Sequence, residues 1–423
     1  MEASETAAVL QREDVLAGVL RRLPARSLAE SRCVCKAWRA VVDDRWLLAP
    51  HLLPHSVRGF FVNYVDHERP HFFARPKIDG EFDFVEDKPY GRDFMVVDHC
   101  NGLVLYQADL VFGELHACNP ITRRSVKLPL PPRVRHYREP RPILVFDPAV
   151  SRHYEVFLAP LHPENQQPSD ELMEWPPLQW KWHRFSSRTG RWRETVFTQD
   201  GEAAGTVADL LMGSLQYSKE PRWRFAAYWQ GSLYVHCHGE YVARMSLSNG
   251  KYKVIQSPID CTGCYNKVKS FLGRSEKGVY FATICRCQLR VWILNESPDR
   301  TQWILKHDKV LKPDDWGGVV INGGYQNIKH DGPWILDDYE KRKTRDDFDW
   351  SSDDDDILHT VDDWNENKNE GYMYPDTFHV LGFHPYKEVV FLTTLSVAVA
   401  FHLNSSKVQF LGILKPNDYN CDY

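Results

Sequence analysis

The sequence predicts an α+β multidomain protein: a small N-terminal three-helix unit, then a large all-β domain that we expect to be a β-propeller of six to eight divergent blades. Helical spacing of apolar residues is confined to the chain before about residue 55, and short alternating strands follow. One strand–turn–strand pattern then recurs over more than 300 residues. A propeller repeats hairpins over that length with only short edges exposed, and stacked β-sandwiches are the alternative.

The helical part begins near Glu13 with a single apolar stripe. Its members recur at i, i+1, i+4, i+5 and i+8, which is one face of an α-helix: Val15, Leu16, Val19, Leu20 and Leu23. Pro24 is expected to end this helix. Ser27 and Glu30 have the spacing of a capping box, so a second helix is predicted to begin at Leu28.

The second predicted helix has an apolar face of its own. Its members are Leu28, Val34, Cys35, Trp38, Val41 and Val42. Cys33 and Cys35 lie roughly 200° apart around a regular helix and cannot bind one ion together, so we interpret them as buried structural thiols. Helices over about 40 residues bury too little surface to be secure alone. This unit is therefore expected to bury more apolar surface, and so become stable, by binding a partner.

The β region is recognised by hairpins with polar turns. The clearest copies span residues 116–129, 144–157, 183–197 and 243–255, with looser copies at 291–307 and 400–414 and a further hairpin at 225–237. They contain no Trp-Asp dipeptide, so the blades are not of the WD40 type. The acidic run from Asp346 to Trp364 is predicted to be a solvated loop inserted around residues 340–372.

Composition limits the partners and the compartment. The net charge of -5 and the pI near 6.4 argue against nucleic acid or an anionic membrane as partner. The longest uncharged apolar run, residues 389–403, is too short to span a bilayer, and the N-terminus lacks the pattern of a signal peptide. Ten scattered cysteines indicate a reducing compartment, so the cytoplasm or the nucleus is expected.

Few residues suggest a catalytic, metal-binding or ligand-binding site. No nucleophile elbow, metalloprotease pair or phosphate-binding glycine loop is present, so we expect neither an enzyme nor a cofactor. A weak zinc candidate combines two cysteine pairs, the second of which would share one face of a strand: Cys261, Cys264, Cys285 and Cys287. The basic and aromatic residues 181–193 and 222–224 could stack bases. This leaves an adaptor-independent module for RNA or glycan as the alternative function.

The stretch from Glu13 to Asp44 resembles the F-box of large plant families. The likeness rests on Leu23-Pro24, Leu28, Asp43 and the run "RCVCKAWR" at residues 32–39. Residues 51–64, 98–106 and 118–129 look like the F-box-associated domain that follows in those families. Gln11-Arg12 stands where that F-box usually has Leu-Pro, a departure that bears on the strength of the adaptor contact.

The resemblance implies a substrate receptor of a ubiquitin ligase with no catalytic residues of its own. The F-box would bind a Skp-type adaptor, which joins a cullin and a RING subunit, while the β domain holds an unknown protein substrate. The expected domains are a flexible N-terminus at 1–9, the F-box at 10–50, a connector with first strands at 51–92, the β domain at 93–415 and a tail at 416–423. The expected adaptor-binding residues are Val15, Leu16, Val19, Leu20, Leu23, Pro24, Leu28, Val34 and Trp38.

Overall fold

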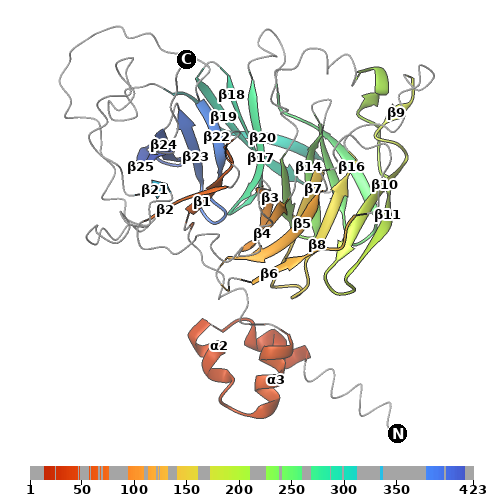
Figure 1. The fold of residues 1–423 in the computed structure, drawn as a ribbon, viewed down its shortest axis with the longest axis vertical. Helices are drawn as coiled ribbons and strands as arrows, with labels where there is room; N and C mark the ends of the chain where they lie inside the picture. The colour runs from red at the N-terminus through yellow and green to blue at the C-terminus, as the bar shows by residue number, and fades with distance from the viewer. Residues whose placement is uncertain are drawn as a thin grey trace, which may run out of the picture.

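The computed structural model describes residues 14–47, 57–75, 94–131, 141–160, 172–209, 225–259, 268–311, 334–336 and 378–414, with short gaps inside several of these ranges. The predicted acidic loop, Gln11-Arg12 and Pro24 lie outside the described residues. A helical unit comes first and strands follow to the end of the described chain (Figure 1). Within these residues no helix is long and apolar enough to cross a membrane.

Three sheets contain four antiparallel strands each, in sequence order. The first is β3 (Phe94–Cys100), β4 (Leu103–Ala108), β5 (Glu114–Asn119) and β6 (Arg124–Lys127). The second is β17 (Lys269–Ser275), β18 (Gly278–Cys285), β19 (Gln288–Glu296) and β20 (Thr301–Val310). The third is β22 (Phe378–Phe383), β23 (Val389–Thr394), β24 (Val397–His402) and β25 (Val408–Ile413).

An eight-stranded sheet combines two further units of four strands. One unit is β7 (Arg141–Val145), β8 (Glu155–Ala159), β10 (Gln179–Ser186) and β11 (Arg191–Gln199). The other is β13 (Ala226–Trp229), β14 (Ser232–Cys237), β15 (Tyr241–Ser246) and β16 (Lys251–Gln256). The outer strands β11 and β16 join them by a short parallel pairing of Thr198 with Lys251 and Gln199 with Tyr252. A two-stranded sheet comprises β9 (Glu174–Trp175) and β12 (Gly205–Thr206).

One three-stranded sheet collects distant parts of the chain. It pairs β1 (Gly59–Val62) with β2 (His71–Ala74), and β2 with β21 (Ile335–Leu336). Trp334, just before β21, makes a bridge to Gly412 of β25. A Cβ at position 412 would lie 2.4 Å from the Trp334 carbonyl oxygen, so only glycine allows this approach. This seam joins the sheet of β1 to the last four-stranded unit.

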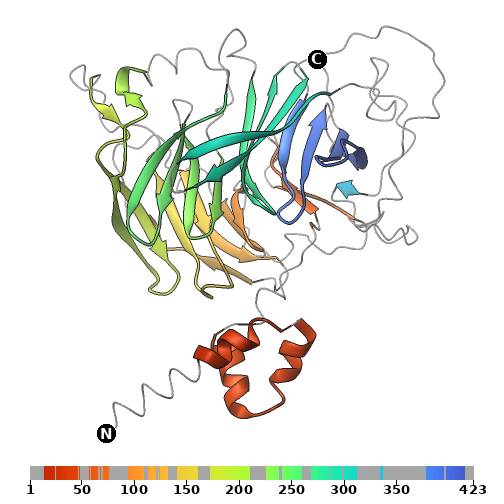
Figure 2. The same ribbon diagram turned by 180° about the vertical axis from the view of Figure 1, so that it is seen from behind.

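The units follow one another around a closed ring. First strands of successive units lie in contact, β3 with β7, β13 with β17, and β17 with β22, and the amide of Asn63, just after β1, donates a 2.8 Å hydrogen bond to the carbonyl of Val96 in β3. Figure 2 shows the sheets of β17–β20 and β22–β25 side by side. The described residues thus form five units of four strands and one of three, which confirms a propeller-like all-β domain.

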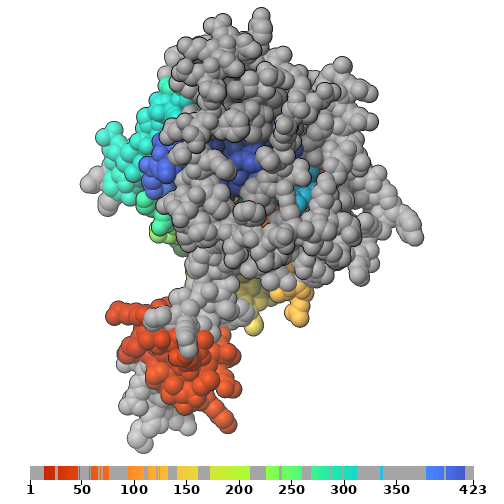
Figure 3. All heavy atoms as spheres, turned by 90° about the vertical axis from the view of Figure 1, so that its left-hand side faces the viewer, coloured from red at the N-terminus to blue at the C-terminus, as the bar shows by residue number. Residues whose placement is uncertain are grey.

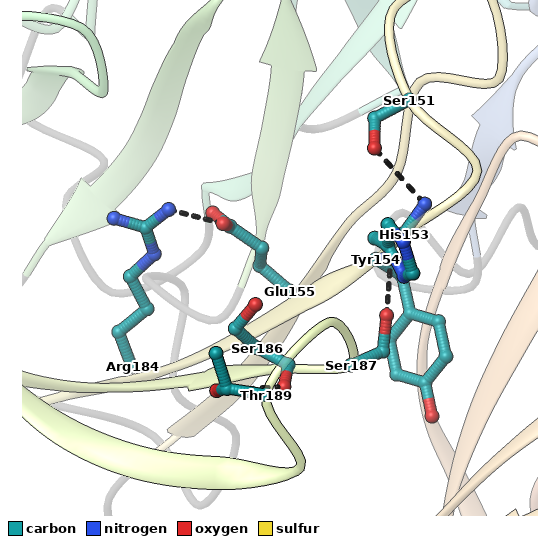
Figure 4. A network of polar contacts seen from close by, with 8 residues as sticks. All are labelled: Ser151, His153, Tyr154, Glu155, Arg184, Ser186, Ser187 and Thr189. Carbon is teal, nitrogen blue, oxygen red and sulfur yellow. Dashed lines mark hydrogen bonds and ion pairs between the residues drawn. The ribbon is translucent and has the colours of Figure 1, made fainter.

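The recurring hairpins are confirmed as paired strands. In five of six copies the pattern is the last hairpin of its unit: β5–β6, β10–β11, β15–β16, β19–β20 and β24–β25. The copy at residues 144–157 is instead the first hairpin, β7–β8. Figure 4 shows how the two turns of that unit meet: the N–H of Tyr154 donates to Ser187 Oγ at 2.9 Å, and Arg184 pairs with Glu155.

Aromatic side chains on the outer strands tie three of the units to the unit before them. Trp192 of β11 donates its indole N–H to the Pro129 carbonyl beyond β6 at 2.8 Å, and Trp303 of β20 donates to Gln256 at the end of β16 at 2.9 Å. The hydroxyl of Tyr252 in β16 donates to the Pro177 carbonyl at 2.8 Å. In these three units the outer strand therefore pairs within its own sheet and also donates a side-chain hydrogen bond to the neighbouring unit.

Candidate functional site

Three short helical segments build the N-terminal unit: residues 14–20, α2 (Ala25–Ser31) and α3 (Lys36–Asp44). Its buried residues are the polar Ser31 and six aliphatic residues: Ala17, Leu20, Leu28, Val41, Val42 and Leu47. Leu16, Leu23 and Trp38 pack against them and stay half-buried. Among the described residues no hydrophobic cluster contains residues of both the N-terminal helical unit and the sheets, and Figure 3 shows the N-terminal helices standing apart from the sheets.

Two ion pairs fasten the ends of the helices together. The Arg32 guanidinium binds Asp43 at the end of α3 through two contacts, Nε to Oδ1 at 2.8 Å and Nη2 to Oδ2 at 3.0 Å. Arg45 reaches Asp14 in the first helical segment, with Nη2 and Oδ1 2.6 Å apart. The hydrogen bond and charge of Asp43 raise the pKa of Arg32 above its usual value. The two residues of each pair are separated by 11 and 31 positions in the sequence, and no local sequence pattern predicts such pairs.

The predicted start of the second helix is wrong. α2 begins at Ala25, directly after Pro24, and proline is favoured at the start of a helix. Ser27 therefore lies inside α2 and is not an N-cap. The chain then turns at residues 32–34, and α3 begins after Cys35, whose Sγ accepts the N–H of Trp38 at 3.4 Å. A cysteine has taken the capping role.

The interpretation of Cys33 and Cys35 as buried thiols is also wrong, because both are exposed. One continuous helix would have turned Cys35 toward the apolar face. The break at residues 32–34 instead places both side chains on the surface between α2 and α3.

The nine predicted adaptor-binding residues fall into three groups. Leu20 and Leu28 are fully buried and support the surface from beneath, while Leu16, Leu23 and Trp38 are half-buried. The members that reach the surface are Val15, Val19 and Val34, with 68%, 56% and 63% of each side chain exposed. Val15 and Val19 are four residues apart and share one helix face. Pro24 lies outside the described residues.

The zinc candidate is not supported where the structure describes it. Cys285 ends β18, whereas Cys287 lies in the following turn with φ 68° and is fully buried among apolar residues. The prediction that these two share one strand face is wrong, because the chain reverses between them. Cys261 and Cys264 lie outside the described residues, and no cluster of metal-binding side chains occurs in the described part of the chain.

The basic and aromatic segment at residues 181–193 offers no stacking surface. Trp182 is buried in the core of the eight-stranded sheet together with its neighbour Trp180. Trp192 is half-buried and uses its N–H on Pro129. Arg184 is half-buried and pairs with Glu155, whereas Arg188 and Arg191 are exposed near the turn. Residues 222–224 lie outside the described part.

The sequence comparison identifies the small helical unit in front of the propeller-like β domain. Residues 13–49 match the F-box domain family. The chain therefore carries an F-box domain, followed by a large all-β propeller-like domain.

Similar proteins come from Arabidopsis thaliana. F-box protein At3g07870 is 30% identical over 134 residues, which is 28% of this chain and 30% of that protein. The F-box protein At5g42430 is 27% identical over 153 residues, or 34% of this chain and 38% of that protein. The matches thus span about a third of these relatives. Among solved structures, apo AztD from Citrobacter koseri covers 76% of this chain and 70% of its own with 10% identity, and its TM-score of 0.29 is too low to carry an argument.

Proposed function

We propose that this protein is the substrate-recognition subunit of a ubiquitin ligase of the Skp–cullin–F-box type. The observation that carries the proposal is the F-box match at residues 13–49, which coincides with the small helical unit. The F-box docks a Skp-type adaptor, and through it a cullin and a RING subunit. The β domain holds the protein to be ubiquitinated.

The exposed valines support an interface on the helices. Three large aliphatic side chains are exposed on a unit whose described core holds six buried aliphatic residues, and the burial of apolar surface favours association with a partner. Val15, Val19 and Val34 form the proposed contact surface, with Trp38 and Leu23 at its base. Leu20 and Leu28 hold that surface in shape.

A receptor of this kind needs no catalytic residues. Ubiquitin transfer requires a substrate lysine near a charged enzyme, and holding two reactants together supplies much of the rate. We therefore propose a non-catalytic role in the cytoplasm or the nucleus. Cys33, Cys35, Cys100, Cys118 and Cys237 are free thiols, as in a reducing compartment.

Adaptor capture tests the proposal. The full chain is expected to bind a purified Skp-type adaptor, and a chain lacking residues 1–50 is expected not to bind it. Normal adaptor binding by the shortened chain would contradict the proposal. Proteins that accumulate on both forms when the proteasome is blocked are substrate candidates.

A point variant locates the contact more sharply. Val19→Glu places a charge on the proposed surface without touching the core and should weaken adaptor binding more than tenfold, since a buried unpaired charge is costly. The matched control is Val150→Glu in the β7–β8 turn, where Val150 is 79% exposed. Equal adaptor affinity of the two variants would show that Val19 is not part of the adaptor interface.

A further inference from the structure

Exposed thiols are confined to one place in the described chain. Cys33 and Cys35 are the exposed cysteines among those described, Cys285 is half-buried, and the others are buried. Burial raises the pKa of Cys100, Cys118 and Cys237 to about 12, so these thiols stay protonated. The thiols of the described chain that are open to a reagent in solution therefore lie at the turn between α2 and α3.

The pair lies at the start of α3, beside a cation. Cys35 precedes α3 with an extended backbone, φ -161°, and its Sγ accepts the N–H of Trp38 at 3.4 Å. It therefore faces the positive end of the helix dipole. The Arg32 guanidinium, held by Asp43, interacts electrostatically with Cys33. Helix starts and neighbouring cations are where cysteines react.

The spacing permits a bond between the two sulfurs. Residues two apart have Cα atoms at most about 7 Å from each other, and a disulfide spans Cα distances of about 4.4–6.8 Å. Val34 lies in a turn, which shortens the separation below that of an extended chain. Both side chains are exposed, so a small disulfide can reach either sulfur.

We propose that Cys33 and Cys35 form a reversible disulfide by exchange with a small disulfide such as oxidised glutathione, and that this bond weakens adaptor binding. The second part rests on the proposed function. One cysteine thiolate attacks glutathione disulfide, forming a mixed disulfide and releasing one glutathione. The other cysteine then attacks the Sγ of the first cysteine, forms the bond between the two protein sulfurs, and releases the second glutathione. Two protein thiols are oxidised, the small disulfide is reduced, and the two protons end on glutathione.

The bond changes the start of α3. Joining Cys35 to Cys33 turns its sulfur toward residue 33 and away from the N–H of Trp38, so α3 loses its N-cap. Trp38 and Val34 adjoin this point and belong to the proposed adaptor surface. Adaptor affinity is expected to fall roughly fivefold to tenfold, the size of a lost helix cap.

Mass measurement of the isolated full chain tests the bond itself. Trypsin cleaves after Arg32 and Lys36 and releases the peptide 33–36, which holds both cysteines. After treatment with oxidised glutathione and trapping of free thiols, this peptide should be lighter by two hydrogens, and dithiothreitol should reverse the change. Cys33→Ser and Cys35→Ser should each yield only a glutathione adduct. A peptide from the natural chain that stays reduced, or carries glutathione alone, would overturn the proposal.

Adaptor binding of reduced and oxidised chains tests the consequence. The natural chain should lose affinity on oxidation, whereas the double variant Cys33→Ser/Cys35→Ser, which has a capping hydroxyl at position 35 and no thiol to oxidise there, should bind alike in both conditions. Equal affinity of the natural chain before and after oxidation would overturn the regulatory part. If the reduced chain binds no adaptor, the proposed function fails, and the peptide mass still decides whether the disulfide forms.

Discussion

The F-box helices and the β ring bury their apolar residues on very different scales. The helices enclose six described aliphatic residues and expose three valines. The ring buries whole indoles, among them Trp180, Trp182 and Trp334. Because buried area sets much of the stability, the helices are close to the limit of independent folding, whereas the ring is secure. The difference indicates that the helical unit has far less buried apolar surface to stabilise it than the ring has.

The largest effect on the difference between the two regions is expected from Leu28→Ala in the helical core. Removing a fully buried leucine costs about 2–5 kcal/mol, which is comparable to the whole stability of so small a unit. Residues 14–47 should lose protection from hydrogen exchange, while β18 keeps it. Val34→Ala, at a position 63% exposed, is the control and should leave both regions protected. Loss of protection in β18 would show that the two regions fold as one.

A smaller effect is expected from Gly412→Ala at the seam of the ring. The new Cβ would lie 2.4 Å from the Trp334 carbonyl oxygen and 3.2 Å from the Phe73 ring. Displacing these groups should cost about 1–3 kcal/mol of unfolding free energy, measured by urea denaturation. Gly382→Ala is the matched control, since its Cβ would meet Phe271 at an ordinary 3.8 Å. Equal midpoints for both variants would argue against a tight seam.

Trp192→Phe removes one tie between neighbouring units and keeps an aromatic ring against Phe185. The loss of the hydrogen bond to Pro129 should lower the free energy of unfolding by about 0.5–1.5 kcal/mol. Val150→Ala in the β7–β8 turn should have no measurable effect. A Trp192→Phe protein as stable as the natural chain would show that packing alone joins these units.

The smallest predicted effect is a dependence of ring stability on pH. Burial, with the nearby charge of Lys127, lowers the pKa of His116. The unfolded chain then binds more protons than the folded chain below about pH 6.5, so stability falls as the pH drops through that value. His116→Gln should lose less stability between about pH 7.5 and about pH 5.5 in urea titrations. His307, whose pKa burial also lowers, would account for the remainder. Identical pH dependence in both proteins would contradict the assignment.

Local features of the fold were predictable from the sequence and distant ones were not. Hairpins such as β15–β16 were found because alternation and turn residues such as Gly250 act over a few residues. The parallel pairing of Thr198 with Lys251 and the sheet of β1, β2 and β21 join distant segments that share no local pattern.

The helical site shows the same limit. The nine adaptor residues were chosen from helical spacing, which does not separate the exposed Val19 from the fully buried Leu20. The start of α2 was missed because the Ser27 and Glu30 pattern competes with Pro24 for the same helix end. The pair of Arg45 with Asp14 depends on how the helices pack, and spacing alone contains no such information.

The seam at Gly412 also governs the order in which the protein can be assembled during synthesis. On the ribosome, β1 and β2 emerge early, yet β21, which pairs with β2, and β25, which packs against it, are made some 260 to 340 residues later. Until then Phe73, fully buried in the finished ring, has no Trp334 to cover it. A transcript cut short before residue 334 would release an F-box attached to an open ring. Such a product would expose apolar strands to chaperones and proteases.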